Sequence, residues 1–291
     1  MLTGSMVAMI TPMKGDGSID WIGLEGLVEH HINEGTDAIV SVGTTGESAT
    51  LTHEEHVEVI DRTVQAVAGR LPVIGGTGSN STEETIMLTR SAFEVGVSAC
   101  LLVVPYYNKP PQEGLYKHFR AVAEAVPIPQ IVYNVPGRTS IDLTNKTMLR
   151  LTEIDNIIGI KDATNDIERG TELIQQAPPE FAVYSGEDGT ACQLMLAGAK
   201  GTISVTANVA PNLMHKMCSA AVEGNTSDAL EYDKKLADLH GAMFVQSNPI
   251  PAKWAVHQQG LVDSGIRLPL VPLQSQYFDI VSSAMTSAGV A

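Results

Sequence analysis

Residues 157–163 read Ile-Ile-Gly-Ile-Lys-Asp-Ala and place a lysine directly after a short run of apolar, mostly β-branched residues. Such a run is typical of a buried strand in a parallel sheet, and Lys161 would then stand at its carboxyl end. Desolvating an ammonium is costly, so a buried lysine tends to lose its proton and become nucleophilic. Lys161 is therefore a candidate nucleophile. This stretch alone fits a solvated loop that begins at Lys161 equally well.

A second candidate segment, Gly43-Thr44-Thr45-Gly46-Glu47-Ser48, also follows an apolar run. Two glycines bracket two hydroxyl residues, which would bring backbone amides and threonine hydroxyls to a small anion such as a carboxylate. An ordinary tight turn before a helix has the same composition. Its residue types therefore make this segment a candidate anion-binding site.

A third segment, residues 133–139, offers a phenol and a guanidinium close together. Tyr133 is able to transfer a proton, and Arg138 is able to hold a carboxylate through two hydrogen bonds. A core tyrosine and a surface arginine remain the alternative interpretation. Tyr106 and Tyr107, adjacent in a proline-rich segment, suit a protein interface, where aromatic residues are enriched.

Short apolar runs that could carry these segments alternate with longer amphipathic stretches along most of the chain. The candidate strands are residues 7–10, 38–42, 72–74, 100–104, 130–133, 157–160, 181–184 and 201–205. Strict alternation of strand and helix implies parallel pairing through right-handed crossovers. Eight such units predict an α/β fold of the (β/α)₈ or TIM-barrel type, whose catalytic groups lie just after the strands. We assign residues 1–224 to the barrel and 225–291 to a C-terminal helical appendage.

Bulk properties narrow the function. A net charge of −15 and a pI near 4.8 argue against a nucleic-acid binder and against attraction to an anionic membrane. The three cysteines lack the spacing of a metal or redox site, so we expect reduced thiols. No leader or membrane-spanning run is visible, so we expect a cytoplasmic location. His53 and His56 are spaced i and i+3, not as in a zinc-protease helix. Nothing in the sequence requires a metal or another cofactor.

Taken together, the motifs resemble the dihydrodipicolinate synthase family across the whole chain. The resemblance rests on residues 43–47, 133–139 and 159–162, which occur in the family's order on the second, fifth and sixth predicted strands. It implies a class I lyase that forms a Schiff base on Lys161 and condenses pyruvate with L-aspartate 4-semialdehyde. The product would be 4-hydroxy-tetrahydrodipicolinate, on the route to diaminopimelate and lysine.

The resemblance also implies roles for single residues. Tyr133, Thr44 and Tyr107 would form a proton relay, with Tyr107 reaching in from the neighbouring subunit of a homotetramer built as a dimer of dimers. The remaining substrate contacts come from the carboxylate-binding residues Thr45, for pyruvate, and Arg138, for the semialdehyde, and from the backbone of Gly186 and Ile203.

A second site is implied for L-lysine as a feedback inhibitor at a subunit interface. The matching residues are Ser48, Ala49, His53, His56, Asn80, Glu84 and Tyr106. Among them, Glu84 is suited to pair with an ammonium. A solvated helix start with interface polar groups is the other interpretation of these residues.

Two positions vary from the family pattern, and neither removes a role. Gly137 stands where serine is common, and Asp162 stands where glutamate is frequent. The alternative functions are a related pyruvate aldolase, such as N-acetylneuraminate lyase or a 2-keto-3-deoxy-sugar-acid aldolase, and a non-catalytic barrel that binds an amino acid or keto acid. Arg138 favours an acceptor with a short carboxylate-bearing chain over a polyhydroxylated one.

Overall fold

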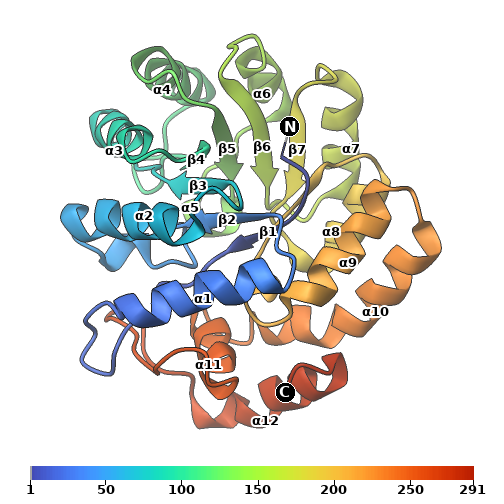
Figure 1. The fold of residues 1–291 in the computed structure, drawn as a ribbon. Helices are drawn as coiled ribbons and strands as arrows, with labels where there is room; N and C mark the ends of the chain where they lie inside the picture. Colours follow the sequence, from blue (N-terminus) through green and yellow to red (C-terminus); the bar gives the residue numbers. More distant parts are fainter. Residues whose placement is uncertain (1) are drawn as a thin grey trace.

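A computed structural model describes residues 2–291 and places eight strands in one closed barrel in which each strand pairs in parallel with its neighbours (Figure 1). The strands are β1 (Gly4–Ala8), β2 (Ala38–Ser41), β3 (Val73–Gly76), β4 (Ala99–Val103), β5 (Gln130–Asn134), β6 (Ile157–Asp162), β7 (Ala182–Ser185) and β8 (Gly201–Ser204). Pairing of β1 with β8 closes the barrel. The predicted TIM-barrel fold is confirmed.

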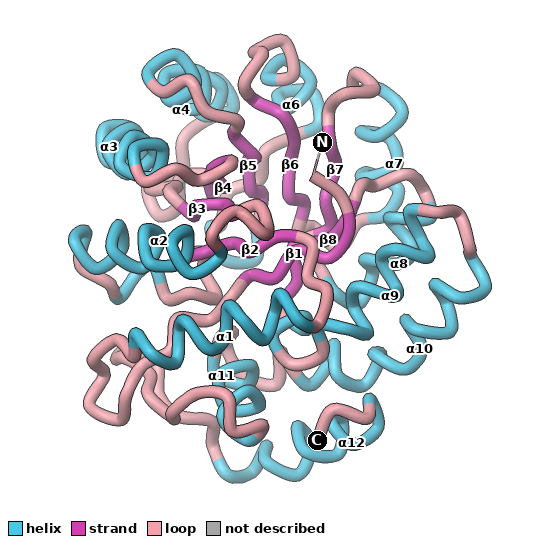
Figure 2. Tube along the Cα trace, in the orientation of Figure 1, coloured by secondary structure: helices cyan, strands magenta, loops and turns pink. Residues whose placement is uncertain are grey.

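Helices follow the strands and form a ring outside the barrel, so that Figure 2 shows the strands enclosed by helices. The ring contains α1 (Trp21–Asn33), α2 (His53–Val67), α3 (Thr82–Glu94), α4 (Gln112–Ala125), α6 (Asn145–Leu151), α7 (Ile167–Gln176), α8 (Asp188–Leu196) and α9 (Pro211–Val222). The short helix α5 (Pro136–Thr139) instead follows β5 directly, at the carboxyl end of the barrel. The local sequence determines where several helices begin. For example, Thr52 and Glu55 form a reciprocal capping box at the beginning of α2.

Three further helices follow the barrel: α10 (Thr226–Ala242), α11 (Ile250–Gln258) and α12 (Phe278–Ala288). They lie along one side of the barrel, where α10 packs against α8 and α9 (Figure 1). Leu236, Val256 and Val281, one from each helix, are fully buried in the same hydrophobic cluster as the outer face of the barrel. The C-terminal helices therefore share a core with the barrel helices.

Both faces of the sheet are buried, as expected for parallel strands covered by helices. One face joins the large cluster under the helices, and the other forms a smaller cluster inside the barrel. The interior cluster includes Met6, Ile131, Tyr133, Tyr184 and Ile203. Its side chains fill the barrel, so the space left for a ligand lies at the carboxyl ends of the strands.

Two strand boundaries differ from the sequence prediction in ways that matter. The first strand begins at Gly4 rather than residue 7, because Asp37 accepts a hydrogen bond from the amide of Ser5 and Gly4 pairs with Gly201. The sixth strand continues through Lys161 to Asp162 instead of ending at residue 160. Lys161 is thus held by strand pairing and does not begin a loop.

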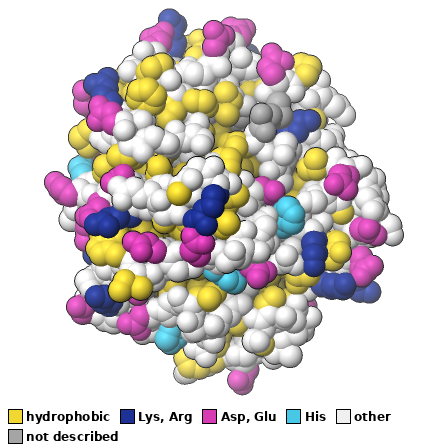
Figure 3. Space-filling view, in the orientation of Figure 1, with side chains coloured by type: hydrophobic (Ala, Val, Ile, Leu, Met, Phe, Trp, Pro, Cys, Tyr) yellow, Lys and Arg dark blue, Asp and Glu magenta, His cyan; other side chains and the backbone are white. Residues whose placement is uncertain are grey.

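The outer surface carries charges of both signs. Figure 3 shows acidic and basic side chains scattered over the face that is drawn, with hydrophobic side chains visible between them. Within residues 2–291, no helix is both long enough and apolar enough to cross a membrane.

Candidate active site

Strand register brings Lys161 and Tyr133 together. Tyr133 of β5 pairs with Lys161 of β6, which in turn pairs with Tyr184 of β7. The Lys161 ammonium nitrogen lies 4.2 Å from the centre of the Tyr133 ring. Lys161 is only 5% exposed, and both residues line a pocket at the carboxyl end of the barrel.

The environment of Lys161 makes its neutral form far more accessible than it is in a free lysine. Burial lowers the pKa of the Lys161 amine to about 8, the carboxylates of Asp188 and Glu187 partly oppose this, and Arg138 adds to it. At pH 7, roughly a tenth of the amine would be unprotonated, compared with well under a thousandth for a free lysine. The site therefore supplies a nucleophilic amine near neutral pH.

Tyr133 is kept protonated in the same pocket. Burial raises the pKa of its phenol to about 12, while Arg138 and a hydrogen bond with Thr44 act in the opposite direction. A phenol that holds its proton and lies beside an amine and a hydroxyl is able to pass a proton between them. Thr44, from the loop after β2, lines the pocket as well.

The loop after β2 is held in an unusual backbone conformation. Val42 and Glu47 both have positive φ, +56° and +59°, and a positive φ is rare for a β-branched residue such as valine. A side chain at Gly46 would lie 2.9 Å from the Val42 Cα, so the turn between them requires glycine. This tight turn fixes Thr44 and Thr45 at the pocket, and Thr45 is only 2% exposed.

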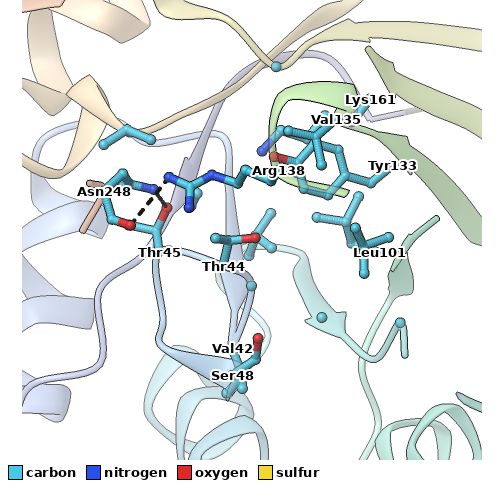
Figure 4. Close-up of a pocket in the computed structure, with 18 of the residues that line it drawn as sticks. Val42, Thr44, Thr45, Ser48, Leu101, Tyr133, Val135, Arg138, Lys161 and Asn248 are labelled. Carbon is cyan, nitrogen blue, oxygen red and sulfur yellow. Dashed lines mark hydrogen bonds between the residues drawn. The ribbon is translucent and has the colours of Figure 1, made fainter. Parts of the chain in front are cut away.

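Arg138 and Thr45 meet at Asn248, from the segment between α10 and α11 (Figure 4). The guanidinium of Arg138 donates to the backbone oxygen of Asn248 at 3.3 Å, and the Asn248 amide donates to the Thr45 hydroxyl at 2.9 Å. Arg138 belongs to the short helix α5 directly after β5. A guanidinium and a threonine hydroxyl in one pocket suit ligands that carry carboxylates.

Gly186 leaves room for chemistry on the lysine. A side chain at this position would lie 3.0 Å from the Lys161 Cε and 2.8 Å from the Ala163 Cβ. The amide of Gly186 donates to the backbone oxygen of Asp162 at 2.7 Å, which ties the ends of β6 and β7 together. Of the residues that the resemblance assigns to the substrates, the pocket is lined by Thr44, Thr45, Tyr133, Arg138, Lys161 and Gly186.

Two assigned residues lie outside this lining in the single chain. Ile203 is fully buried in the interior cluster of the barrel, while Val205, two residues later, lines the pocket. Tyr107 has a positive φ of +70° and is 88% exposed in the loop after β4. Its position in the relay therefore stays a prediction, because it depends on a neighbouring subunit.

The predicted lysine-site residues gather where α2, α3 and three loops meet. His53 and Glu84 are joined by a 2.7 Å hydrogen bond, and Ser79 also donates to Glu84. The hydrogen bond from Ser79, and then that with His53, lower the pKa of Glu84. His56 is buried and its Nε2 bonds to the backbone oxygen of Gly76 at 2.7 Å.

The other members of that group lie around this pair. Asn108 connects two of them. Its side-chain amide donates to the backbone oxygen of Asn80, and its backbone N–H donates to the backbone oxygen of Tyr106. Tyr106 is 39% exposed and Ala49 is exposed, whereas Ser48 lines the active-site pocket. The two groups of residues are thus neighbours.

The sequence prediction missed Glu187, Asp188 and Asn248. Glu187 lines the pocket, and Asp188, 2% exposed, accepts hydrogen bonds from the amides of Val205 and Thr206 with one oxygen. The two acids follow the seventh strand, a position that could have marked them. Asn248 follows no strand, and its sequence context gave no signal.

Comparison with known proteins agrees with this geometry. Residues 1–288 match the model of the dihydrodipicolinate synthetase family. The 4-hydroxy-tetrahydrodipicolinate synthase of Ectopseudomonas mendocina (strain ymp) is 58% identical over 290 residues, which cover 100% of this chain and 99% of that protein.

Solved structures agree as well. Dihydrodipicolinate synthase from Acinetobacter baumannii, a chloride-inhibited enzyme crystallised with pyruvate, is 54% identical with a TM-score of 0.99, and each chain is covered completely. The enzyme from Cyanidioschyzon merolae, crystallised with lysine bound, is 39% identical with a TM-score of 0.96, over 100% of this chain and 99% of that one. By sequence, fold and pocket residues, this chain belongs to the dihydrodipicolinate synthetase family.

Proposed function

We propose that this chain condenses pyruvate with L-aspartate 4-semialdehyde to give 4-hydroxy-tetrahydrodipicolinate, a step of diaminopimelate and lysine biosynthesis. The observation that carries the proposal is a buried Lys161 of lowered pKa beside Tyr133, in a member of this family. Such a step joins small metabolites, and we propose that it takes place in the cytoplasm.

The proposed reaction begins on Lys161. Its neutral amine attacks the keto carbon of pyruvate, water leaves, and the resulting imine withdraws electrons from the neighbouring methyl group. Loss of a methyl proton gives an enamine, which attacks the aldehyde carbon of the second substrate and forms the new carbon–carbon bond. Tyr133 and Thr44 move protons in these steps together with Tyr107 of a neighbouring subunit.

The anionic substrates are held by different groups in this proposal. Thr45 and the amides of its loop bind the carboxylate of pyruvate, and Arg138 binds that of the semialdehyde. Gly186 keeps the space beside Lys161 open, and the backbone near Ile203 supports the floor of the site. In a chain with a net charge of −15, such local donors are needed to attract anions.

The first test is intact-protein mass spectrometry after mixing the protein with pyruvate and sodium borohydride, followed by peptide mapping. We expect one pyruvate-derived adduct on Lys161. An unmodified Lys161 in folded protein would contradict the Schiff-base mechanism. Turnover is then measured with L-aspartate 4-semialdehyde and, separately, with N-acetylneuraminate; use of the latter alone would favour the aldolase alternative.

We also propose that L-lysine inhibits the enzyme at the group formed by His53, Glu84 and their neighbours. Support comes from the His53–Glu84 hydrogen bond, which presents a carboxylate to an ammonium, and from the relative that was crystallised with lysine. Titration of L-lysine into a steady-state assay tests this. Glu84→Gln should weaken inhibition, whereas Glu83→Gln, on the same helix but exposed, should not.

A homotetramer completes the proposal. The exposed Tyr107 and the partly exposed Tyr106 would be covered in an assembly, and Tyr107 would enter the neighbouring active site. Sedimentation velocity measures the assembly directly. Tyr107→Phe should retain the assembly and lose turnover, while a monomer with full activity would overturn the shared site. We further propose that residues 225–291 form a helical unit attached to a barrel of residues 1–224.

A further inference from the structure

Asn248 is a C-terminal residue in a pocket that the barrel loops otherwise build. It is 5% exposed, lies between α10 and α11, and lines the pocket together with Phe244. In Figure 4 its side chain points at Thr45, and the arm of Arg138 reaches its backbone. One residue from outside the barrel thus contacts both of the side chains to which carboxylate binding is assigned above.

The direction of the Asn248–Thr45 hydrogen bond has a chemical consequence. The amide Nδ2 of Asn248 only donates, so the hydroxyl oxygen of Thr45 is the acceptor in their 2.9 Å bond. A hydroxyl has one proton, and within residues 2–291 no protein acceptor takes the proton of Thr45. That proton is left for a ligand, and a hydroxyl that accepts one hydrogen bond becomes a better donor of another.

The other end of the amide argues against a packing role. The Oδ1 of Asn248 is buried and has no protein hydrogen-bond partner within the described residues. An unpaired buried acceptor is costly, whereas a leucine of similar size would fill the space without that cost. What distinguishes asparagine here is its amide donor to Thr45.

We propose that Asn248 is a positioning residue for pyruvate: its amide fixes the Thr45 hydroxyl as a donor directed at the carboxylate of the keto acid. This inference rests on the function proposed above. It makes part of the substrate site a property of the C-terminal region, because the barrel supplies Thr45 but not the group that orients it.

A double-mutant cycle tests the inference. Asn248→Leu removes the donor without adding charge, and Thr45→Val removes the hydroxyl. We expect Asn248→Leu to raise the KM for pyruvate about tenfold while kcat changes less than about threefold, because ground-state binding is what it weakens. In the Thr45→Val background the same change should raise KM less than about twofold, since the group through which it acts is absent.

The second substrate provides an internal control. Asn248→Leu keeps the backbone oxygen that receives Arg138, so the KM for L-aspartate 4-semialdehyde should stay within about twofold of the native value. Ser247→Ala, at an exposed neighbouring position, should leave both KM values unchanged. Circular dichroism and melting temperature establish that each variant is folded.

Borohydride trapping separates failure of the inference from failure of the proposed function. If the native protein forms no adduct with pyruvate, the proposed function falls. If the native protein forms it, and folded Asn248→Leu reaches half-maximal adduct at the same pyruvate concentration, the positioning role is overturned. Equal fold-changes in KM in the two Thr45 backgrounds would also overturn it, because Asn248 would then act independently of Thr45.

Discussion

Two buried lysines occupy different regions of this molecule and have different surroundings. Lys161 on β6 is 5% exposed and Lys253 on α11 is 4% exposed, and burial lowers the pKa of both. Lys253 forms a buried ion pair with Glu47. Lys161 makes no ion pair within residues 2–291; the acids that influence it act from a distance.

The comparison teaches that burial alone does not make a nucleophile. At Lys253 the carboxylate of Glu47 compensates the charge, and the pair connects α11 to the loop that carries Thr45. At Lys161 the amine faces a pocket in which Gly186 leaves space beside it. A lysine without a contacting carboxylate and with room for a substrate is the one that can react.

Replacing each lysine in turn should separate the two roles most strongly. Lys161→Ala should abolish the borohydride-trapped adduct and lower kcat/KM by about a thousandfold or more, because the covalent intermediate cannot form. Lys253→Met, assayed under conditions where it is folded, should still form the adduct. An adduct on Lys253 in the Lys161→Ala protein would show that Lys253 is also reactive, and the two lysines would then not differ in this respect.

Replacing Lys253, rather than Lys161, should lower the free energy of unfolding most. Lys253→Met leaves Glu47 buried without its counterion, which is expected to cost about 3–5 kcal/mol of unfolding free energy. Urea denaturation followed by circular dichroism measures the loss. Adding Glu47→Gln should recover part of it, and Lys235→Met, which removes an exposed lysine paired with Glu231, should leave the midpoint unchanged. Equal urea midpoints for Lys253→Met and Lys235→Met would contradict a stabilising role for the buried ion pair.

The pH dependence of pyruvate use should report the amine of Lys161. Its pKa is lowered to about 8, so the reactive neutral form increases as pH rises and is nearly complete about one unit above that value. We expect kcat/KM for pyruvate to rise roughly tenfold from pH 7 to a plateau near pH 9, with an inflection close to 8. A profile flat over this range would show that the free amine does not titrate there.

The smallest expected effect concerns the distant acids. Asp188 and Glu187 both raise the pKa of Lys161, but Asp188 also holds backbone amides after β8, so Glu187 is the cleaner position to change. Glu187→Gln should shift the inflection to lower pH by less than about one unit. Glu180→Gln, exposed before β7, serves as the control. A shift to higher pH would reverse the assigned sign.

Much of the site could be predicted because barrel chemistry follows the strands. Lys161, Tyr133 and the loop with Thr44 and Thr45 each follow or end an apolar run, and parallel closure brings such ends to one face. The interaction between Lys253 and Glu47 could not be predicted in this way. Both residues are polar in the sequence, and only their burial together reveals the ion pair.

The alternation of strands and helices, and with it the barrel and the residues at its carboxyl end, follows from the amino-acid sequence, because periodicity and residue type are local properties. Tertiary structure alone decided which distant groups complete the site. Asn248 meets Thr45 across 203 positions of the chain, and Glu47 meets Lys253 across 206. Such contacts depend on where the C-terminal helices pack, and no local pattern records that choice.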